Sequence, residues 1–473
     1  MPADRRRFLI LLLSIGGLVL YVSTACVNIG IVALDDYHEI VAQIIPAQFQ
    51  SATQIIAGAG IRSPVPSLVL LTLSRTALHL GLTDPVAQYR FVLIVLAIFS
   101  FAVLSTVARR HFRDERDGNK EIVALCLISF FWLAPYFFSR TLIESLAAPF
   151  VAASAWFTTD YWLRGRRSSL ALSVFALMVA ATFRFQVGVC YAAIVAVFVL
   201  RRQWRDSWVL LASSAVAFMI PGLIDLWLRG SFYASLRAYV DYNVHYSSSY
   251  GVHPFYSFVT LFLAITIPPA FWLRYRGLRW REEYRPLLPA LLFFAVFLVA
   301  HSAVPHKEDR FMVPIVPVFL ICLVPLAHYI WQKSRWRTVY FLAINAVLLV
   351  ITSFTVEQRN TIGLVLYLGR HPEITRVVGV DETLVLYPSA YTLRPPADTS
   401  VAASDLAGMP MTCNTAIAVR QAFKTSVAEL NAKGEKVAEF RPGLLEQLVI
   451  RINPGSNARR TTIELYRGPG CGG

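Results

Sequence analysis

Apolar runs long enough to cross a membrane recur from residue 8 to residue 353, and they limit the possible folds of this 473-residue chain most strongly. A transmembrane helix needs about 20 mostly apolar residues, and most of these runs come close to that length. We expect eleven spans, at 8–27, 88–108, 121–138, 143–162, 169–183, 185–200, 207–228, 255–273, 287–304, 311–331 and 338–353. The sequence therefore predicts a mainly α-helical, polytopic membrane protein with about eleven transmembrane helices.

The composition excludes several classes of protein. Hydrophobic residues make up 56% of the chain and charged residues only 15%, whereas about 25% of a soluble domain is charged. The net charge of +15 does not indicate nucleic-acid binding, because the basic residues lie in short loops between apolar runs. The six cysteines are scattered and form no Cys-x-x-Cys pair, so no zinc site is predicted.

The distribution of basic residues predicts the orientation in the membrane. With eleven spans, 22 of the 44 Lys and Arg residues lie in the loops on the N-terminal side, 9 lie on the opposite side, and 13 lie in the tail. Cytoplasmic loops are the ones enriched in Lys and Arg, so we expect an inside N-terminus and an outside C-terminus. We keep the short runs 169–183 and 185–200 as two spans, because fusing them would place the basic loops 274–285 and 333–337 outside.

Two segments do not read as membrane spans. Residues 30–87 are predicted to form a first outer loop whose helices lie at the membrane interface, since the run 68–82 is apolar but short. Residues 354–473 are more polar, and we interpret them as a small α/β domain on the outer face, after a transmembrane domain of residues 1–353.

The tail offers candidate strands and a pair of cysteines. Apolar residues recur at 383–387 and 448–452 in a way that is typical of strands. Cys413 and Cys471 both lie in this domain, and two alternatives stay open for them: a disulfide in an oxidising compartment, or two separate thiols.

A charged segment, His306-Lys307-Glu308-Asp309-Arg310-Phe311, lies between two apolar runs. Charged groups in such a position are costly unless they pair, meet water or act in function. A solvated loop is the simplest alternative, but it would not need all five polar residues together. The segment resembles the signature His-Lys-Glu-(Glu/Asp)-Arg-Phe of glycosyltransferase family 22, whose members include the mannosyltransferases of GPI-anchor and dolichol-linked oligosaccharide synthesis and bacterial relatives.

The expected topology places five polar clusters on the non-cytoplasmic side. They are Asp35 with Asp36, Arg140 with Glu144, Arg184 with Gln186, Asp225 with the loop 241–256 that contains Tyr250 and His253, and the charged segment 306–311. Ionisable groups near a membrane usually face a water-filled site. We therefore predict that these clusters share a cavity at that surface.

Three of these clusters extend the resemblance to family 22. The family has His-Pro-Asp-Glu after its first helix, where this chain has Ala-Leu-Asp-Asp ending at Asp36, and the spacing favours Asp35 as the match. Residues 140–144 are similar to the family's Arg-Thr-Leu-x-Glu, and residues 250–254 match its Tyr-Gly-x-His-Pro. The resemblance implies a GT-C membrane fold, a polyprenyl-phosphate sugar donor and inversion at the sugar.

Each cluster can be given a role under this resemblance. Attack by a sugar hydroxyl needs a base, which we assign to Asp35 with Asp36 beside it, and departure of a lipid phosphate needs fixed positive charge. For that phosphate we predict Arg184, His306, Lys307 and Arg310. For substrate binding we predict Arg140, Glu144, Gln186, Asp225, Tyr250, His253, Glu308 and Asp309. Structural alternatives are an Arg140–Glu144 ion pair on one helix face and an Arg184 side chain that reaches the membrane interface.

The predicted function is transfer of a hexose, with mannose expected, from a polyprenyl-phosphate donor to a lipid-linked or cell-surface glycan acceptor. Besides donor and acceptor we expect contact with membrane lipids, no nucleic acid and no cofactor. A divalent metal at Asp35-Asp36 stays open, although no His or carboxylate cage surrounds it in the sequence. The expected location is the plasma membrane of a bacterium, with the active face outside.

Two alternatives belong to other classes or other donors. A multispan lipid or polysaccharide transporter would also carry charges near the membrane, but transporters often show internal repeats, and we find none here. A GT-C enzyme that uses another sugar, such as glucose or arabinose, is the second alternative, against which the segment 306–311 favours family 22.

Overall fold

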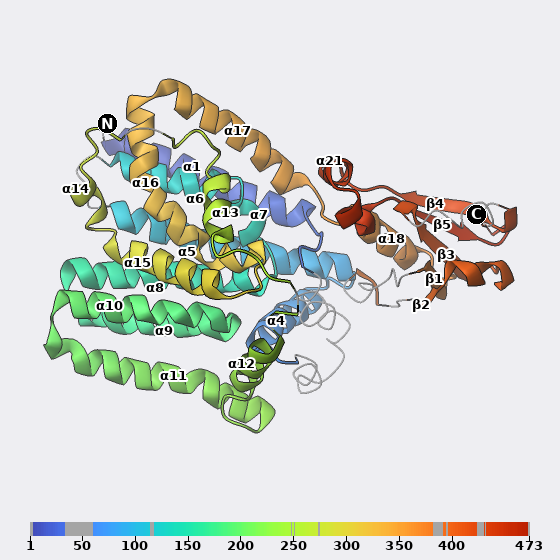
Figure 1. Ribbon diagram of the computed structural model, residues 1–473, viewed down its shortest axis with the longest axis horizontal. Coiled ribbons are helices and arrows are strands. Elements are labelled where there is room, and N and C mark those ends of the chain that lie inside the picture. Colours follow the sequence, from blue (N-terminus) through green and yellow to red (C-terminus); the bar gives the residue numbers. More distant parts are fainter. Residues whose placement is uncertain are drawn as a thin grey trace. The chain divides into compact units, whose positions relative to one another are not determined.

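The computed structural model describes residues 3–33, 60–113, 118–246, 248–249, 251–272, 275–381, 391–393, 396–422, 430 and 432–471. The chain divides into two compact units (Figure 1). The first is formed by Met1–Ala25, Ala59–Leu68 and Leu93–Ser353, and the second by Cys26–Gly58, Val69–Val92 and Phe354–Gly473.

Helices account for nearly all regular structure before residue 355. The α-helices are α1 (Ala3–Val27), α4 (Val65–His79), α5 (Pro85–Phe112), α6 (Asn119–Phe130), α7 (Ala134–Phe138), α8 (Ile143–Arg164), α9 (Arg167–Phe183), α10 (Tyr191–Arg201), α11 (Ser207–Arg229), α12 (Ala234–Tyr246), α13 (Ser257–Ile265), α14 (Trp280–Tyr284), α15 (Leu288–Ala303), α16 (Val316–Lys333) and α17 (Arg335–Phe354). Short 3₁₀ turns η3 (Phe185–Cys190), η4 (Trp204–Asp206) and η5 (Asp309–Ile315) lead into α10, α11 and α16.

Five helical segments in the described part of the chain are long and apolar enough to cross a membrane. They are Asp4–Val27, Pro85–Phe112, Trp204–Arg229, Asp309–Lys333 and Arg335–Arg370. Shorter apolar helices lie at Arg167–Phe183, Phe185–Arg201 and Leu288–Ala303. The multispan architecture is as expected, while the count of eleven spans stays a prediction.

Small side chains let α8 lie at the centre of the first unit. Ala147, Ala148, Val151, Ala152 and Ala155 are all fully buried, and small residues allow membrane helices to approach closely. Helix α8 contacts α9, α15 and α16. Hydrogen bonds to α9 reinforce this packing, and at the end of α8 the Asp160 carboxylate accepts one from the Ser169 hydroxyl. This core holds the ends of α8 and α9 in place.

The runs 169–183 and 185–200 form two helices, as predicted. Arg184 separates them with extended backbone angles, φ −142° and ψ 103°. The turn η3 then starts the second helix. An arginine is thereby placed at a break between two apolar helices.

Three expectations about this unit need correction. The predicted span 121–138 is two helices, α6 and α7, because Phe131 is extended and a proline opens α7. The predicted span 255–273 contains only the nine residues of α13, which ends shortly before Pro268 and Pro269. The predicted loop 241–256 begins as a helix, since α12 continues to Tyr246.

The tail forms the sheet of the second unit. Its strands are β1 (Arg376–Val380), β2 (Ala397–Val401), β3 (Thr415–Arg420), β4 (Glu435–Phe440) and β5 (Ile463–Arg467), and their order is β2-β1-β3-β5-β4. Strand β1 pairs in parallel with β2 and β3, whereas β5 pairs antiparallel with β3 and β4. Helix α18 (Arg359–Arg370) packs against β4 and β5. The predicted small α/β domain is therefore present.

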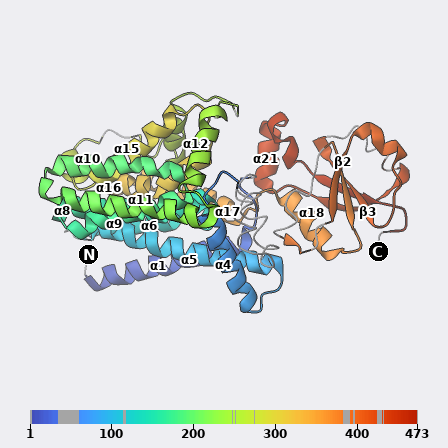
Figure 2. The same ribbon diagram turned by 90° about the horizontal axis from the view of Figure 1, so that it is seen from below.

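One expected strand of this domain is a helix. Residues 448–452 belong to α21 (Leu444–Ile452), shown beside the sheet strands in Figure 2. Leu444, Leu448 and Ile452 recur every four residues, which is helical spacing, and the Glu446 side chain caps the helix by accepting the Gly443 N–H at 3.0 Å. The other expected strand, 383–387, lies outside the described residues.

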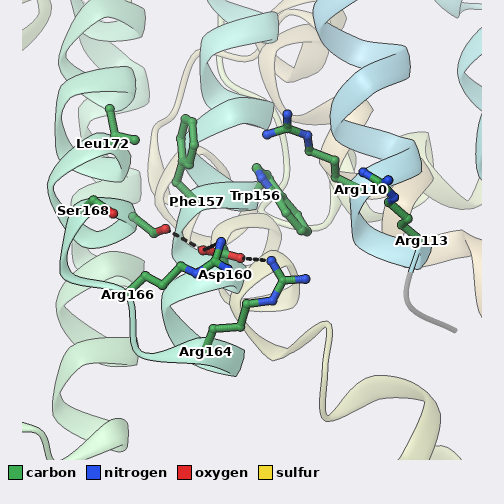
Figure 3. A pocket seen from close by; sticks show the side chains of 10 residues that line it. Arg110, Arg113, Trp156, Phe157, Asp160, Arg164, Arg166, Ser168 and Leu172 are labelled. Atoms are coloured by element: carbon green, nitrogen blue, oxygen red, sulfur yellow. Dashed lines mark hydrogen bonds and ion pairs between the residues drawn. The ribbon is translucent and has the colours of Figure 1, made fainter.

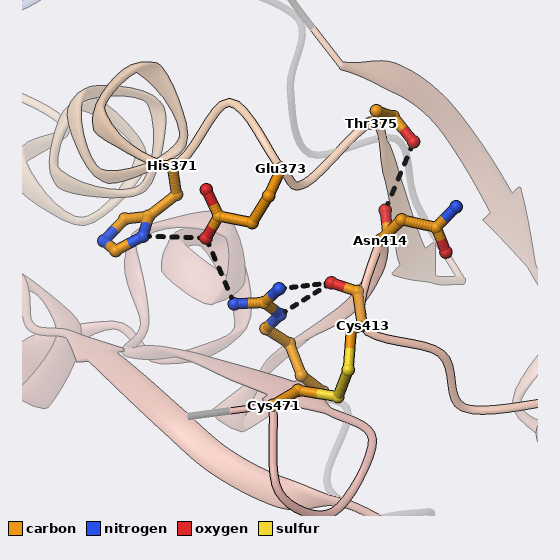
Figure 4. A network of polar contacts seen from close by, with 7 residues as sticks. His371, Glu373, Thr375, Cys413, Asn414 and Cys471 are labelled. Carbon is orange, nitrogen blue, oxygen red and sulfur yellow. Dashed lines mark hydrogen bonds and ion pairs between the residues drawn. A yellow bond between two sulfur atoms is a disulfide. The ribbon is translucent and has the colours of Figure 1, made fainter. Parts of the chain in front are cut away.

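The two tail cysteines form a disulfide. Cys413 and Cys471 are joined with their Cα atoms 5.2 Å apart (Figure 4). The Arg467 guanidinium donates to the Cys413 carbonyl and forms an ion pair with Glu373, with 3.3 Å between Nη1 and Oε1. A backbone hydrogen bond, together with His371 and Arg467, holds the pKa of the Glu373 carboxyl below its usual range. The end of the chain is thereby fastened to the start of β3.

Candidate functional site

The alternating direction of the helices brings several polar segments to one end of the first unit. Helices α8, α9, α10 and α11 lie side by side in both views, and short turns connect them, so successive helices are antiparallel (Figures 1 and 2). Arg140 precedes the start of α8, Arg184 follows the end of α9, and segment 306–311 follows the end of α15. Helix α8 and α15 both contact η5. We call the residues gathered there the candidate site.

A buried ion pair joins two of the predicted clusters. The Arg184 Nη2 atom lies 3.3 Å from Glu144 Oε1, and these side chains are only 9% and 0% exposed. The guanidinium carbon of Arg184 also lies 5.0 Å from the centre of the Phe311 ring. The first turn of α8, the break after α9 and the turn η5 thus meet at Arg184.

The charged segment is organised by Glu308. Its carboxylate accepts from Arg310 Nε at 2.6 Å and lies 3.0 Å from His306 Nε2. The Lys307 ammonium group donates to the carbonyls of Val304 at 2.6 Å and His253 at 3.0 Å. The His253 N–H in turn donates to the Pro305 carbonyl at 3.0 Å. The segment is therefore a folded structure and not an irregular solvated loop.

Positive charge exceeds negative charge among the described residues of the candidate site. Four cations, Arg140, Arg184, Lys307 and Arg310, are each less than 10% exposed. The carboxylates held against them are Glu144 and Glu308. Buried cations strengthen attraction to an anion, because the local dielectric constant is lower than that of water. The arrangement therefore favours an anionic group at this end of the helices.

The predicted pairing of Arg140 with Glu144 on one helix face does not describe this geometry. Helix α8 begins only at Ile143, so Arg140 lies in the preceding turn and is not one helical turn from Glu144. The Arg140 guanidinium carbon instead lies 4.7 Å from the centre of the Tyr136 ring. Glu144 extends to Arg184 across the helices.

Asp225 contacts a neighbouring helix in the structure. Its carboxylate accepts from the Ser235 N–H at 2.8 Å and from the Ser235 hydroxyl at 2.5 Å, which fixes the start of α12. The Tyr239 ring of α12 lies 5.5 Å from the ring of Phe185, next to Arg184. Asp225 thus supports the candidate site indirectly, and its role in substrate binding stays a prediction.

The other predicted residues are more exposed to solvent than the four cations or lie outside the described residues. Gln186 is half-buried and Asp309 and the His253 side chain are exposed. Asp35, Asp36 and Tyr250 lie outside the described residues. No group of three or more His, Cys, Asp or Glu side chains within the described ranges is arranged to hold a metal ion.

Two aromatic residues of the candidate site have no role in the sequence-based prediction. Phe311 lies against both Arg184 and Arg310, at 5.0 Å and 5.7 Å between guanidinium carbon and ring centre, and Tyr136 lies under Arg140. Such contacts hold a guanidinium in place without neutralising it. Phe311 ends the charged segment, which could have indicated it, whereas the contact of Tyr136 with Arg140 depends on the turn after α7.

Comparison with known proteins decides the family. The model of the Alg9-like mannosyltransferase family matches residues 57–378. The chain belongs to this family. The match confirms the predicted likeness to family 22, and it covers the described residues of the candidate site.

Individual relatives of the family are distant. The chain is 26% identical over 330 residues to "GPI mannosyltransferase 3" of Yarrowia lipolytica, covering 67% of this chain and 62% of the relative. It is 25% identical over 330 residues to the Drosophila melanogaster protein of that name, covering 64% of this chain and 54% of the relative. The matched part thus spans less than two thirds of these relatives.

A solved structure shares the fold. ArnT from Cupriavidus metallidurans, in a crystal structure with undecaprenyl phosphate, superposes with a TM-score of 0.57 at 12% identity and full coverage of both chains. With the apolar helices and the tail sheet, this likeness shows a GT-C membrane fold with a small C-terminal α/β domain. The chain is an integral, multi-pass membrane protein of this fold.

Loss of the buried ion pair is expected to destabilise the protein. Glu144→Ala leaves the Arg184 charge buried without this partner, and removal of one member of a buried pair costs about 3–5 kcal/mol. Chemical unfolding in detergent measures the change. The matched control is Glu282→Ala, since the Arg279–Glu282 pair is 77% and 63% exposed, and an exposed pair contributes at most about 1 kcal/mol. Equal losses in the two variants would contradict a structural role for the buried pair.

Proposed function

We propose that this protein transfers a hexose, with mannose expected, from a polyprenyl-phosphate donor to a lipid-linked or cell-surface glycan acceptor with inversion. Membership of the Alg9-like mannosyltransferase family supports the reaction class. The observation that carries the proposal is the cluster of buried cations at one end of the helices, with Arg184, Lys307 and Arg310 each less than 10% exposed.

The proposed reaction is a single displacement. An acceptor hydroxyl oxygen attacks the anomeric carbon of the sugar, and the bond from that carbon to the lipid phosphate oxygen breaks. The hydroxyl proton passes to the Asp35 carboxylate as the general base. The electron pair leaves with the phosphate, whose added negative charge is stabilised by fixed cations.

The described contacts hold the cations in fixed positions, as stabilisation of a leaving phosphate requires. Glu308 fixes Arg310 at 2.6 Å, and two carbonyls fix Lys307, so neither side chain needs to reorganise when charge develops. Preorganised charge of this kind lowers a barrier more than mobile charge does. Arg184, held between Glu144 and Phe311, supplies the fork of donors that matches a phosphate.

The proposed location is the plasma membrane of a bacterium, with the N-terminus in the cytoplasm and the candidate site and tail outside. The charge bias of the loops supports this orientation. The Cys413–Cys471 disulfide supports it too, because disulfides persist in oxidising compartments. We further propose residues 1–353 as the glycosyltransferase domain and 354–473 as the outer domain.

Reporter fusions test the orientation. A reporter that is active only outside the cytoplasm, joined after residue 354, is expected to be active, and the same reporter joined in the basic loop 333–337 is expected to be silent. The pair of fusions controls for expression, since the junctions are separated by α17 alone. A cytoplasmic signal at residue 354 would contradict the orientation and move the proposed site to the other face.

Mass spectrometry of a deletion strain tests the function in the cell. Glycolipids and surface glycans of the strain are expected to lack one hexose, and a plasmid copy of the gene restores it. An Asp35→Asn copy is expected to leave the hexose missing although the protein is present in the membrane. Unchanged glycans in the deletion strain would contradict the proposal.

A further inference from the structure

A polar pocket lies at the opposite end of the helices from the candidate site. Its cavity of about 410 Å³ is lined by the ends of α5 and α8 and the start of α9 (Figure 3). Helix α8 has 22 residues, so it is about 33 Å long, close to the thickness of the hydrocarbon core. Helix α5, whose end also lines the pocket, is long and apolar enough to cross a membrane, so we expect the pocket at the level of the lipid headgroups on the other membrane surface.

Arginine side chains from three helix ends converge on this pocket. It is lined by Arg110, Arg113, Arg164 and Arg166. The buried Asp160 carboxylate, 4% exposed, holds Arg164 at 2.7 Å and lies 3.9 Å from Arg166. Arg110 and Arg113 form no ion pair with any residue that the structure describes. The described lining thus carries more positive than negative charge.

Apolar side chains border the same pocket. Leu172 is one of its lining residues and is 46% exposed, and Trp156 forms part of its wall. A free inorganic anion would gain nothing from an exposed leucine. A lipid fits both features, because its phosphate contacts the arginines while its acyl chains cover the apolar border.

We propose that this pocket binds the phosphate-bearing headgroup of an anionic membrane phospholipid. Guanidinium groups match phosphate oxygens with paired hydrogen-bond donors. Asp160 holds two of the arginines at the pocket before the lipid arrives, so less side-chain freedom is lost on binding. The proposal concerns a site separate from the candidate site and does not depend on the reaction proposed above.

Titration of lipid into the purified full-length protein tests this proposal. Native mass spectrometry follows the binding of phosphatidylglycerol and phosphatidylcholine. Phosphatidylglycerol is expected to bind more tightly, and Arg110→Gln/Arg113→Gln to weaken its binding about thirty-fold, since each arginine near an anionic lipid surface contributes about 1 kcal/mol. The matched control, Arg202→Gln/Arg205→Gln, removes two arginines from the α10–α11 connection on the same surface, outside the pocket lining. It is expected to change the affinity less than three-fold.

Several results would overturn the proposal. Equal weakening in both double variants would show diffuse attraction to basic loops instead of a site. Equal affinity for the two lipids would mean that no anionic headgroup enters the pocket. Stabilisation of the folded protein by inorganic phosphate alone, to the same extent as by phosphatidylglycerol, would assign the pocket to a soluble anion.

A single variant replaces the double variant if Arg110→Gln/Arg113→Gln fails to fold. Arg166→Gln changes a side chain that is 60% exposed, and it is expected to weaken phosphatidylglycerol binding about five-fold. Unchanged binding in this variant would overturn the proposal.

Discussion

Asp35→Asn is expected to lower the rate of sugar transfer by about 10²–10⁴, while donor binding survives. The substitution keeps the size of the side chain and removes the carboxylate that takes the hydroxyl proton. Asp35 follows the first apolar run and matches the family's carboxylate position most closely by spacing. Transfer from a polyprenyl-phosphate mannose donor is measured together with donor binding in the same preparation.

Asp36→Asn is the matched control for this prediction. Neighbouring carboxylates influence each other's protonation, so this variant is expected to be slower than the wild type but faster than Asp35→Asn. An inactive Asp36→Asn beside an active Asp35→Asn would assign the base to Asp36. Normal rates in both variants would contradict a base at this pair, and Glu308 and Asp309 would be the next candidates.

Arg310→Ala and Lys307→Ala are each expected to lower transfer by about 10²–10³, which is typical for loss of a preorganised charge contact. The effect should appear mainly in kcat, because the cations meet more negative charge in the transition state than in the bound donor. Steady-state kinetics with the polyprenyl-phosphate donor separate kcat from KM.

Charge-conserving and remote variants control for folding. Arg310→Lys keeps the charge but loses the Nε–H that donates to Glu308, so an intermediate rate is expected. Arg279→Ala removes an exposed cation outside the candidate site and is expected to keep the wild-type rate. Rates near normal in both Arg310→Ala and Lys307→Ala would show that the segment 306–311 does not act on the leaving phosphate.

Much of the architecture could be predicted because the length and position of apolar runs indicate where membrane helices lie. The break at Arg184 could be predicted for the same reason, since an arginine interrupts two apolar runs there. The tail domain was visible as a change to polar composition. The helix α21 was mistaken for a strand because a short apolar run fits both periods, and the i, i+4 spacing of Leu444, Leu448 and Ile452 is what decides it.

The candidate site could be predicted as a list of residues but not as a set of contacts. The segment 306–311 and the pair Arg140 and Glu144 carry recognisable patterns. The partner of Glu144 could not be predicted, because Arg184 is forty residues away in sequence and reaches it only through the packing of α8 against α9. Local spacing suggested Arg140 instead, and the start of α8 after that residue removes the helical geometry on which this pairing depends.

Direct measurement of the transfer reaction tests the central claim. The purified protein is reconstituted with polyprenyl-phosphate mannose labelled in the sugar and with membranes of the deletion strain as the source of acceptor. We predict that label enters a glycan or glycolipid while an equal amount of free polyprenyl phosphate is released, and that Asp35→Asn releases almost none. Labelled donor that crosses or stays in the membrane without release of polyprenyl phosphate would contradict a transferase and indicate a transporter.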